Sequence, residues 1–234
     1  AMYLAKEKGR NNYQFYTPLL NSRTLDRLKL ESDLRLALNH GGFELHYQPQ
    51  IFAHSGNLWG AEALVRWRHP ERGLVSPADF IPIAEETGLI IPLGEWVFAE
   101  AARQVTAWRK QGLLNLVVSV NISAVQFRKD DFVERIKTIL KEEGAAAHSL
   151  ELELTESILM HDMESSIETL KYLRELGFRI AIDDFGTGFS SLNYLRRLPV
   201  NVLKIDQSFV REMLAEQASL AIVESIISLA HSLG

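Results

Sequence analysis

Short runs of apolar residues alternate along the chain with longer stretches of helical periodicity. Runs rich in β-branched and aliphatic residues predict six strands, at residues 43–51, 58–67, 116–122, 150–154, 179–183 and 202–206. Apolar residues at helical spacing predict helices at residues 80–87, 95–111, 132–143, 163–176, 191–197 and 219–233. Only a short loop separates the first two strands, so we expect them to be antiparallel. The remaining strand–helix series predicts a parallel sheet or a (β/α) barrel.

Polar side chains occupy one face of the predicted strands. In residues 150–154 the leucines share one face while Glu151 and Glu153 share the other, because alternate side chains of a strand point the same way. The same parity places on this second face Gln48, Glu62, Leu64, Arg66, Ser119, Asn121, Asp183, Lys204 and Asp206. An open doubly wound sheet is covered by apolar side chains on both faces, whereas barrel active sites gather polar groups at the carboxyl ends of the strands. The pattern therefore favours a TIM-like (β/α) barrel with an antiparallel first strand.

The residues before position 43 have a different character. Residues 1–16 read as the end of a helix closed by Gly9, followed by a short aromatic strand, which is too little to fold alone. An amphipathic helix is then predicted over residues 22–39, ending at Gly41 and Gly42, with its apolar positions at Leu25, Leu28, Leu34 and Leu38. We therefore expect residues 1–20 to be the tail of a preceding domain, 21–42 a linker helix and 43–234 the main domain.

Composition narrows the class of protein. The 234 residues, 47% hydrophobic and 24% charged, suit one large globular domain, and the absence of cysteine leaves no disulfide or thiolate metal site. No apolar run approaches the roughly 18 residues of a membrane span, and no signal peptide opens the chain, so we expect a cytoplasmic location. A longer parent protein could still be anchored in a membrane through regions outside this chain. A net charge of −5 argues against nucleic-acid binding but leaves an anionic small ligand open.

Acidic residues crowded into one interior raise each other's pKa unless a cation compensates them, so the pattern predicts a metal site. The candidate ligands are all oxygen donors, which suit Mg²⁺ or Mn²⁺ rather than zinc: Glu62, Asn121, Glu153, Asp183 and Asp184. Asp183 and Asp184 are consecutive, so a distortion of the strand would be needed to turn both toward one site. Two metals about 3.5–4 Å apart would suit phosphoester hydrolysis. Lys204 would orient water or neutralise a phosphoryl charge, and Arg66 could hold a phosphate oxygen.

Plainer interpretations apply to each residue alone. An acidic residue at a strand end is more often solvated or ion-paired, and Glu151 can simply pair with Lys204 or another cation. The convergence of five oxygen ligands on one face makes solvation or simple ion pairing a weaker explanation for the five residues together. The glycines at 186 and 188 are a weak signal for a phosphate-binding loop, and we expect instead a loop beside the metal site.

The Glu62-Ala-Leu64 segment, continued as Val65-Arg66-Trp67, resembles the signature of EAL domains, which hydrolyse the bacterial second messenger cyclic di-GMP. The resemblance covers residues 25–234 and includes the motifs at 47–49, 80–85, 119–123, 153–156, 182–188 and 203–206. Residues 1–16 similarly resemble the C-terminal end of a GGDEF (diguanylate cyclase) domain. The parent protein is thus similar to a GGDEF–EAL tandem.

This resemblance implies a set of roles. The first metal would be bound by Glu62, Asn121, Glu153 and Asp183, and the second reached by Asp183 and Asp184. Lys204 would help position the attacking water, and Glu156 would anchor the loop 184–191, which couples metal, substrate and dimer contacts. The catalytic set is then Glu62, Asp183, Asp184, Lys204 and Glu156, and the dinucleotide would be bound by Gln48, Leu64 and Arg66. The implied reaction is in-line attack of metal-activated water on one phosphodiester, giving linear pGpG.

The family continues with two further strands, the first bearing another metal-binding glutamate, whereas this chain ends on a predicted helix at His231-Ser-Leu-Gly234. We therefore expect a barrel lacking its last two strands and a second metal site lacking one carboxylate. Exposed sheet edges favour a homodimer. A catalytically inactive module that binds cyclic di-GMP or a protein partner stays open as an alternative, as does a barrel that acts on another phosphodiester.

Overall fold

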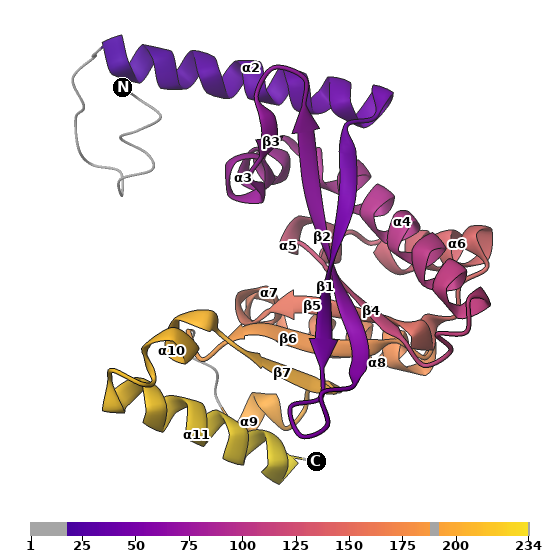
Figure 1. Cartoon of the computed structure of the whole chain (residues 1–234), viewed down its shortest axis with the longest axis vertical. Helices are drawn as coiled ribbons and strands as arrows, with labels where there is room; N and C mark the ends of the chain where they lie inside the picture. The colour runs from indigo at the N-terminus through magenta and orange to yellow at the C-terminus, as the bar shows by residue number, and fades with distance from the viewer. Residues whose placement is uncertain (1–17, 188–191, 234) are drawn as a thin grey trace. The chain divides into compact units, whose positions relative to one another are not determined.

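The computed structural model describes residues 18–187 and 192–233 (Figure 1). The predicted tail of a preceding domain lies almost wholly outside the described residues. The chain divides into two compact units: residues up to 44 with 66–89, and residues 45–65 with 90 onward.

The larger unit is built on a mainly parallel sheet. Strands β1 (Phe43–Ile51), β2 (Leu58–His69), β4 (Val117–Asn121), β5 (Leu150–Thr155), β6 (Arg179–Phe185) and β7 (Val202–Ile205) are hydrogen-bonded in that order. Figure 1 shows β1 and β2 running in opposite directions, and every later pairing from β2 to β7 is parallel. These are the strand order and directions of a TIM-like (β/α) barrel with an antiparallel first strand, as the pattern predicts.

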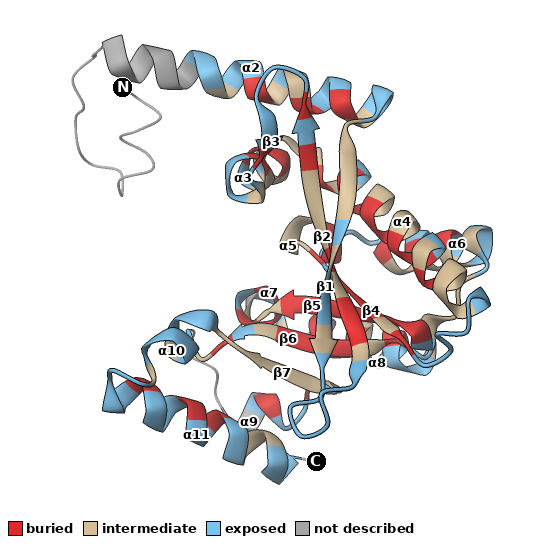
Figure 2. Ribbon diagram, viewed as in Figure 1, coloured by how far each residue is buried: buried red, intermediate tan, exposed pale blue. Residues whose placement is uncertain are grey.

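Aliphatic side chains on one face of the sheet form the core of this unit. Val118, Val120, Leu150, Leu152 and Ile180 are fully buried (Figure 2). Helices α4 (Ile90–Lys110) and α8 (Met163–Glu175) contact β4 and β6, and α6 (Phe132–Glu143) packs on α4. Burying each large aliphatic side chain contributes about 1.5–3 kcal/mol, so this layer fixes the strands that carry the polar face.

Short elements connect the strands and were not predicted by the pattern. They are α5 (Ala124–Phe127), η1 (Ala147–Ser149), α7 (Glu156–His161) and α10 (Gln207–Glu212). The remaining short helix, α9 (Leu192–Leu195), lies inside the predicted range 191–197. Helices of three to six residues are too short to repeat an apolar period, so periodicity carries no signal for such elements.

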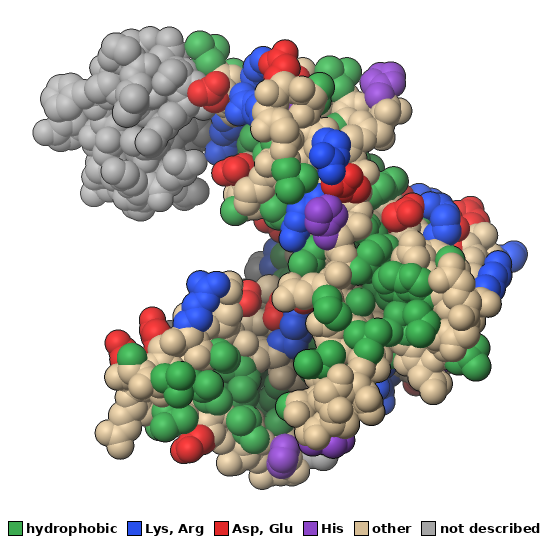
Figure 3. Space-filling view, in the orientation of Figure 1, with side chains coloured by type: hydrophobic (Ala, Val, Ile, Leu, Met, Phe, Trp, Pro, Cys, Tyr) green, Lys and Arg blue, Asp and Glu red, His purple; other side chains and the backbone are tan. Residues whose placement is uncertain are grey.

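Helix α11 (Gln217–Leu233) follows β7 and contacts it. The helix buries Val223 and Ile226 but exposes Leu220, Ile222 and Ile227, and hydrophobic side chains gather on its surface (Figure 3). No strand follows β7 within the described part of the chain, so the six predicted strands account for the whole path of the sheet from β1 to β7.

The smaller unit contains α2 (Pro18–His40), β3 (Gly73–Val75) and α3 (Pro77–Thr87). Strand β3 pairs with the last three residues of β2, a pairing too short to be predicted from alternation. Helix α3 begins at the N-cap Ser76, whose side chain accepts a hydrogen bond from the Ala78 amide, and ends at Gly88 in the left-handed conformation.

The apolar face assigned to α2 from the sequence is partly wrong. The helix packs on α3 through Leu30, Leu34 and Ala37, whereas Leu25 and Leu28 are 59% and 57% exposed. Leu30, Leu34 and Ala37 also have helical spacing, so the sequence was compatible with two overlapping apolar faces of α2. Only packing determined which of the two faces is buried. Among the described residues, no helix combines the length and the apolar character that crossing a membrane requires.

Candidate functional site

Lys204, on β7, lies among three carboxylates from three other strands. Its Nζ atom is 3.2 Å from Glu62 Oε2, 2.6 Å from Glu153 Oε2 and 3.3 Å from Asp183 Oδ1. All four residues belong to the larger unit. The structure thus brings together three of the predicted metal ligands and the lysine predicted to lie beside them.

Asn121 completes this group at the end of β4. Its Nδ2 donates a hydrogen bond of 2.9 Å to Glu62 Oε1, and the next residue, Ile122, donates its amide to the Glu153 carbonyl oxygen. Register explains the convergence, because Asn121 pairs with Glu153 on β5 and Thr155 pairs with Asp183 on β6. In parallel strands such neighbours place their side chains at the same edge of the sheet.

The predicted distortion at Asp184 is present. The pairing of β6 with β7 shifts register between Ile182 and Phe185, and Asp184 has a φ of 53°, the left-handed region that disfavours most residues. Burial, the neighbouring Asp183 charge and a hydrogen bond with Asp206 raise the pKa of Asp184. Asp184 therefore lies beside Asp206 as well as Asp183.

Asp206 was not among the predicted site residues. It is the N-cap of α10, where its side chain accepts hydrogen bonds from the amide and the hydroxyl of Ser208, and these hold the pKa of Asp206 below its usual value. Strand parity had already placed it on the polar face with Lys204. This placement on the polar face was the signal that the sequence contained for Asp206. It could not show that Asp206 would form a hydrogen bond with Asp184.

Glu153 is the most deeply buried acid of the group. Its residue is 1% exposed, and burial, with the Glu62 and Asp183 charges, raises the pKa of Glu153 to about 8 against the opposing effect of Lys204. Burial alone would lower the pKa of Lys204, but the surrounding carboxylates raise it above its ordinary value. Lys204 is therefore protonated at neutral pH, whereas Glu153 binds a proton more tightly than an ordinary glutamate.

The residues present fit a divalent cation. Glu153 Oε1 is buried and has no hydrogen-bond partner among the described residues, and such an acceptor is stabilised by a cation. The five predicted ligands offer only oxygen atoms, as Mg²⁺ and Mn²⁺ prefer. Within residues 18–187 and 192–233, however, no three acidic or histidine side chains lie close enough to form a ready-made metal centre.

Glu156 begins α7 and is 4% exposed. Neither of its carboxylate oxygens has a hydrogen-bond partner in the described part of the chain. Residues 188–191 of the loop that Glu156 is predicted to anchor lie outside the described residues. The anchoring role therefore stays a prediction.

The three predicted substrate-binding residues lie on β1 and β2. Gln48 lies exposed on β1, and Leu64 is half-buried on β2, both in the larger unit. Arg66, further along β2, belongs to the smaller unit, and its contact with a substrate stays a prediction.

A second polar cluster involves Glu151, two residues before Glu153 on β5. Glu151 Oε1 accepts a hydrogen bond of 2.9 Å from Ser119 Oγ, and Oε2 accepts one of 3.2 Å from Arg179 Nε. The Arg179 guanidinium also lies 5.5 Å from the centre of the Trp59 ring. Of the two partners considered for Glu151, another cation is therefore correct and Lys204 is not.

Comparison with known proteins agrees with these features. Residues 31–234 match the EAL domain family. The bifunctional diguanylate cyclase/cyclic di-GMP phosphodiesterase MucR of Pseudomonas aeruginosa is 44% identical over 233 residues, covering 100% of this chain and 34% of the relative. The cyclic di-GMP phosphodiesterase PdeR of Escherichia coli is 43% identical over 233 residues, covering 100% of this chain and 35% of the relative.

A solved structure of the PaMucR phosphodiesterase in complex with c-di-GMP has the same fold. It superposes with a TM-score of 0.86 at 44% identity, covering 88% of this chain and 83% of that one. The chain spans 34% and 35% of the lengths of the two curated relatives. On the family match over residues 31–234 and these identities along the whole chain, the protein belongs to the EAL domain family.

Proposed function

We propose that this domain hydrolyses one phosphodiester bond of cyclic di-GMP and releases linear pGpG. The observation that carries the proposal is the convergence of Glu62, Asn121, Glu153 and Asp183 around Lys204. Two relatives that cover this chain along its length are named cyclic di-GMP phosphodiesterases, and a similar solved structure contains c-di-GMP.

The reaction would depend on a divalent cation, Mg²⁺ or Mn²⁺, with two in the complete site. Glu62, Asn121, Glu153 and Asp183 would hold the first, and Asp183 with Asp184 would reach the second. Bound in this way, the cations would supply Lewis acidity and lower the pKa of a coordinated water. Glu153, whose pKa is raised to about 8, must release its proton before its carboxylate can bind a cation, so cation binding will release protons.

Lys204 would act as a fixed positive charge during the reaction. The surrounding carboxylates hold its pKa above the ordinary value, so it keeps its proton and can donate hydrogen bonds throughout. Its ammonium group would orient the attacking water and stabilise the charge that develops on the phosphoryl oxygens. It is suited to this role because it already lies within 3.3 Å of all three carboxylates.

The remaining residues would bind the substrate and couple it to the rest of the protein. Gln48, Leu64 and Arg66 would contact the dinucleotide, with Arg66 on a phosphate oxygen. Glu156 would anchor the loop 184–191. An upstream GGDEF domain, suggested by the sequence of residues 1–16, is a further part of the proposal. So are a homodimer, suggested by exposed sheet edges, and a cytoplasmic location, expected from the sequence.

One observation favours a second candidate, a module that binds cyclic di-GMP without turnover. Lys204 already compensates three carboxylates, and the described residues form no ready-made metal centre. In this arrangement Lys204 supplies positive charge to the three carboxylates that a cation would otherwise supply.

The deciding experiment is a turnover assay with Mg²⁺ or Mn²⁺ on the purified chain and on the natural protein that contains it, with pGpG detected by chromatography. We expect pGpG from the natural protein and none after Glu62→Ala. Glu134→Ala, which removes a surface carboxylate on α6, is the matched control and should leave turnover unchanged. Binding of cyclic di-GMP without product, in folded protein, would establish the non-catalytic module instead.

A further inference from the structure

The chain turns sharply where it leaves β4, directly after Asn121. Ser123 is the N-cap of α5 and forms a capping box with Gln126. The Gln126 amide donates to Ser123 Oγ at 3.2 Å, and the Ser123 amide donates to Gln126 Oε1 at 3.2 Å. Because α5 has only four residues, these two hydrogen bonds add to the three backbone hydrogen bonds donated by Phe127, Arg128 and Lys129.

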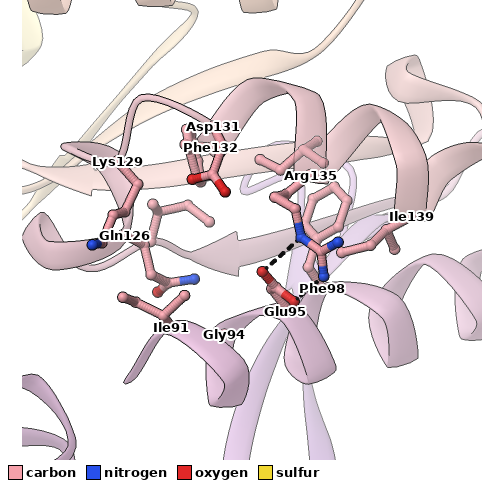
Figure 4. Close-up of a pocket in the computed structure, with 12 residues that line it drawn as sticks. Ile91, Gly94, Glu95, Phe98, Gln126, Lys129, Asp131, Phe132, Arg135 and Ile139 are labelled. Carbon is pink, nitrogen blue, oxygen red and sulfur yellow. Dashed lines mark hydrogen bonds and ion pairs between the residues drawn. The ribbon is translucent and has the colours of Figure 1, made fainter. Parts of the chain in front are cut away.

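The side chain of Gln126 is buried against helix α4, at Gly94. Gln126 is 7% exposed, and Figure 4 shows it extending toward α4 near Ile91 and Gly94. A Cβ atom at Gly94 would lie 1.8 Å from Gln126 Nε2 and 2.5 Å from Gln126 Oε1, so no residue with a side chain fits there without moving Gln126. Glycine inside a helix is unfavourable by about 1 kcal/mol relative to alanine, and the space taken by Gln126 explains its presence.

A cavity adjoins this contact but is too small for a ligand of its own. It has a volume of about 30 Å³ and is walled by Phe98, Phe132, Ile136 and Ile139 (Figure 4). Ligand pockets measure roughly 300 Å³ or more, and a single water needs about 10–15 Å³. Gln126 and Gly94 both line this cavity, which therefore adjoins their contact without offering a site for a ligand.

The capping box lies two residues from a member of the proposed site. Asn121 donates to Glu62 Oε1, Ile122 is held by its hydrogen bond to the Glu153 carbonyl, and Ser123 is held by Gln126. We propose that Gln126, seated on Gly94, is a positioning residue that fixes Asn121 toward Glu62. This inference rests on the proposed function for its effect on cation binding, but not for its effect on the orientation of Asn121.

A double-mutant cycle tests the contact. Gln126→Ala removes Oε1, the atom that accepts the hydrogen bond from the Ser123 amide in the capping box. Gly94→Ala should keep the fold, because the group in its way is the end of a flexible side chain, and it should displace the Gln126 amide from the box. Each change should weaken Mn²⁺ binding, measured by isothermal titration calorimetry, about fivefold, the effect of one hydrogen bond of about 1 kcal/mol. Because both act through one contact, the double variant should also lose about fivefold rather than about 25-fold.

The orientation of Asn121 gives a second measurement that needs no cation. The side-chain amide signal of Asn121 in a ¹⁵N–¹H spectrum, identified by its loss in Asn121→Ala, should shift in Gln126→Ala and in Gly94→Ala. Ile139→Val, which alters the wall of the same cavity without touching the box, is the matched control and should leave both the signal and Mn²⁺ binding unchanged.

The outcomes separate the two proposals. An unchanged Asn121 signal, additive effects in the double variant, or an equal effect of Ile139→Val would each overturn the positioning role of Gln126. If the unsubstituted protein neither binds Mn²⁺ nor forms pGpG, the proposed function fails, and the Asn121 signal alone then decides the role of Gln126.

Discussion

Two buried carboxylates on the same face of β5 differ in how completely their oxygen atoms are hydrogen-bonded. Glu151 and Glu153 are each 1% exposed and two residues apart. Both oxygens of Glu151 accept hydrogen bonds, one from Ser119 and one from the Arg179 guanidinium. Glu153 has one oxygen paired with Lys204, the other has no partner among the described residues, and burial raises its pKa to about 8.

The difference distinguishes a carboxylate that serves the fold from one suited to chemistry. A buried charge costs free energy unless it is paired and its hydrogen-bonding capacity is filled, and the cluster around Glu151 satisfies both conditions. The group around Glu153 leaves an acceptor open and gathers further acids nearby. Unsatisfied acceptors and shifted pKa values of this kind are typical of functional sites.

The largest effect should come from Glu153→Gln. The substitution keeps the shape of the side chain but removes the charge that a cation needs, so turnover of cyclic di-GMP should fall by at least about 10³-fold. The free energy of unfolding without metal should stay the same or rise, because a buried carboxylate is removed. Turnover by chromatography and urea unfolding with a chelator test the two parts, and a stable variant that retains turnover would contradict the assignment.

Glu151→Ala should lower stability and leave turnover nearly unchanged, the reverse of Glu153→Gln. It leaves Ser119 Oγ without its acceptor and opens a space beside Arg179, so the free energy of unfolding should fall by about 2–3 kcal/mol. Turnover per folded molecule should change by no more than a few-fold, because Glu151 is not among the proposed cation ligands. Loss of turnover in a variant shown to be folded would mean that the two carboxylates belong to one site.

The pH dependence should follow the raised pKa of Glu153. The folded protein binds this proton more tightly than the unfolded chain, whose glutamate has a pKa near 4.5. The corresponding stability is fully present below pH 4.5 and is lost as pH rises through about 8. The metal-free protein should therefore become less stable between pH 6 and pH 8, by at most about 1.4 kcal/mol per pH unit, while its affinity for Mn²⁺ rises by at most about tenfold per unit.

Unfolding and calorimetric titrations at several pH values in this range test the pH dependence. Glu153→Gln supplies the control, since it should flatten the stability profile. A profile with the same slope in the variant would assign the titration to another group.

Asp184→Gly should change stability little. It is the only non-glycine residue with positive φ in the described part of the chain, and it lies beside the Glu153 group rather than the Glu151 cluster. Glycine adopts this conformation without steric strain but loses more entropy on folding, so Asp184→Gly should change the free energy of unfolding by less than about 1 kcal/mol. Turnover should still be lost with the carboxylate. A large stability change would mean that the backbone conformation depends on the side chain.

Alternation along single strands was enough to predict the polar face. It placed Glu62, Asn121, Glu153, Asp183 and Lys204 on one face, and the structure brings them within hydrogen-bond and ion-pair distance. The partner of Glu151 could not be predicted in this way: alternation left Lys204 or another cation open, and the partner proved to be Arg179, 28 residues away. Register across β5 and β6 made the choice.

The errors have the same origin. Leu25 and Leu28 fit the helical period of α2 as well as Leu30 does, and only the position of α3 decided which of them is buried. Helices α5, α7 and α10 were not predicted because helices of four to six residues are too short for an apolar period to repeat. The capping box of Ser123 and Gln126 was not predicted, and the need for Gly94 opposite it arises from a contact between α4 and α5.

Local periodicity and the order of the motifs were therefore enough to predict the strand–helix order, the face on which polar residues lie and the family of the chain. Which charged side chains form ion pairs with one another depends on the tertiary structure. In the folded protein Glu151 pairs with Arg179 and Glu153 pairs with Lys204. Asp184 forms a hydrogen bond with Asp206. Ion pairs and hydrogen bonds act over a few ångströms in space, and distances of that size between separate strands are set by register, twist and packing.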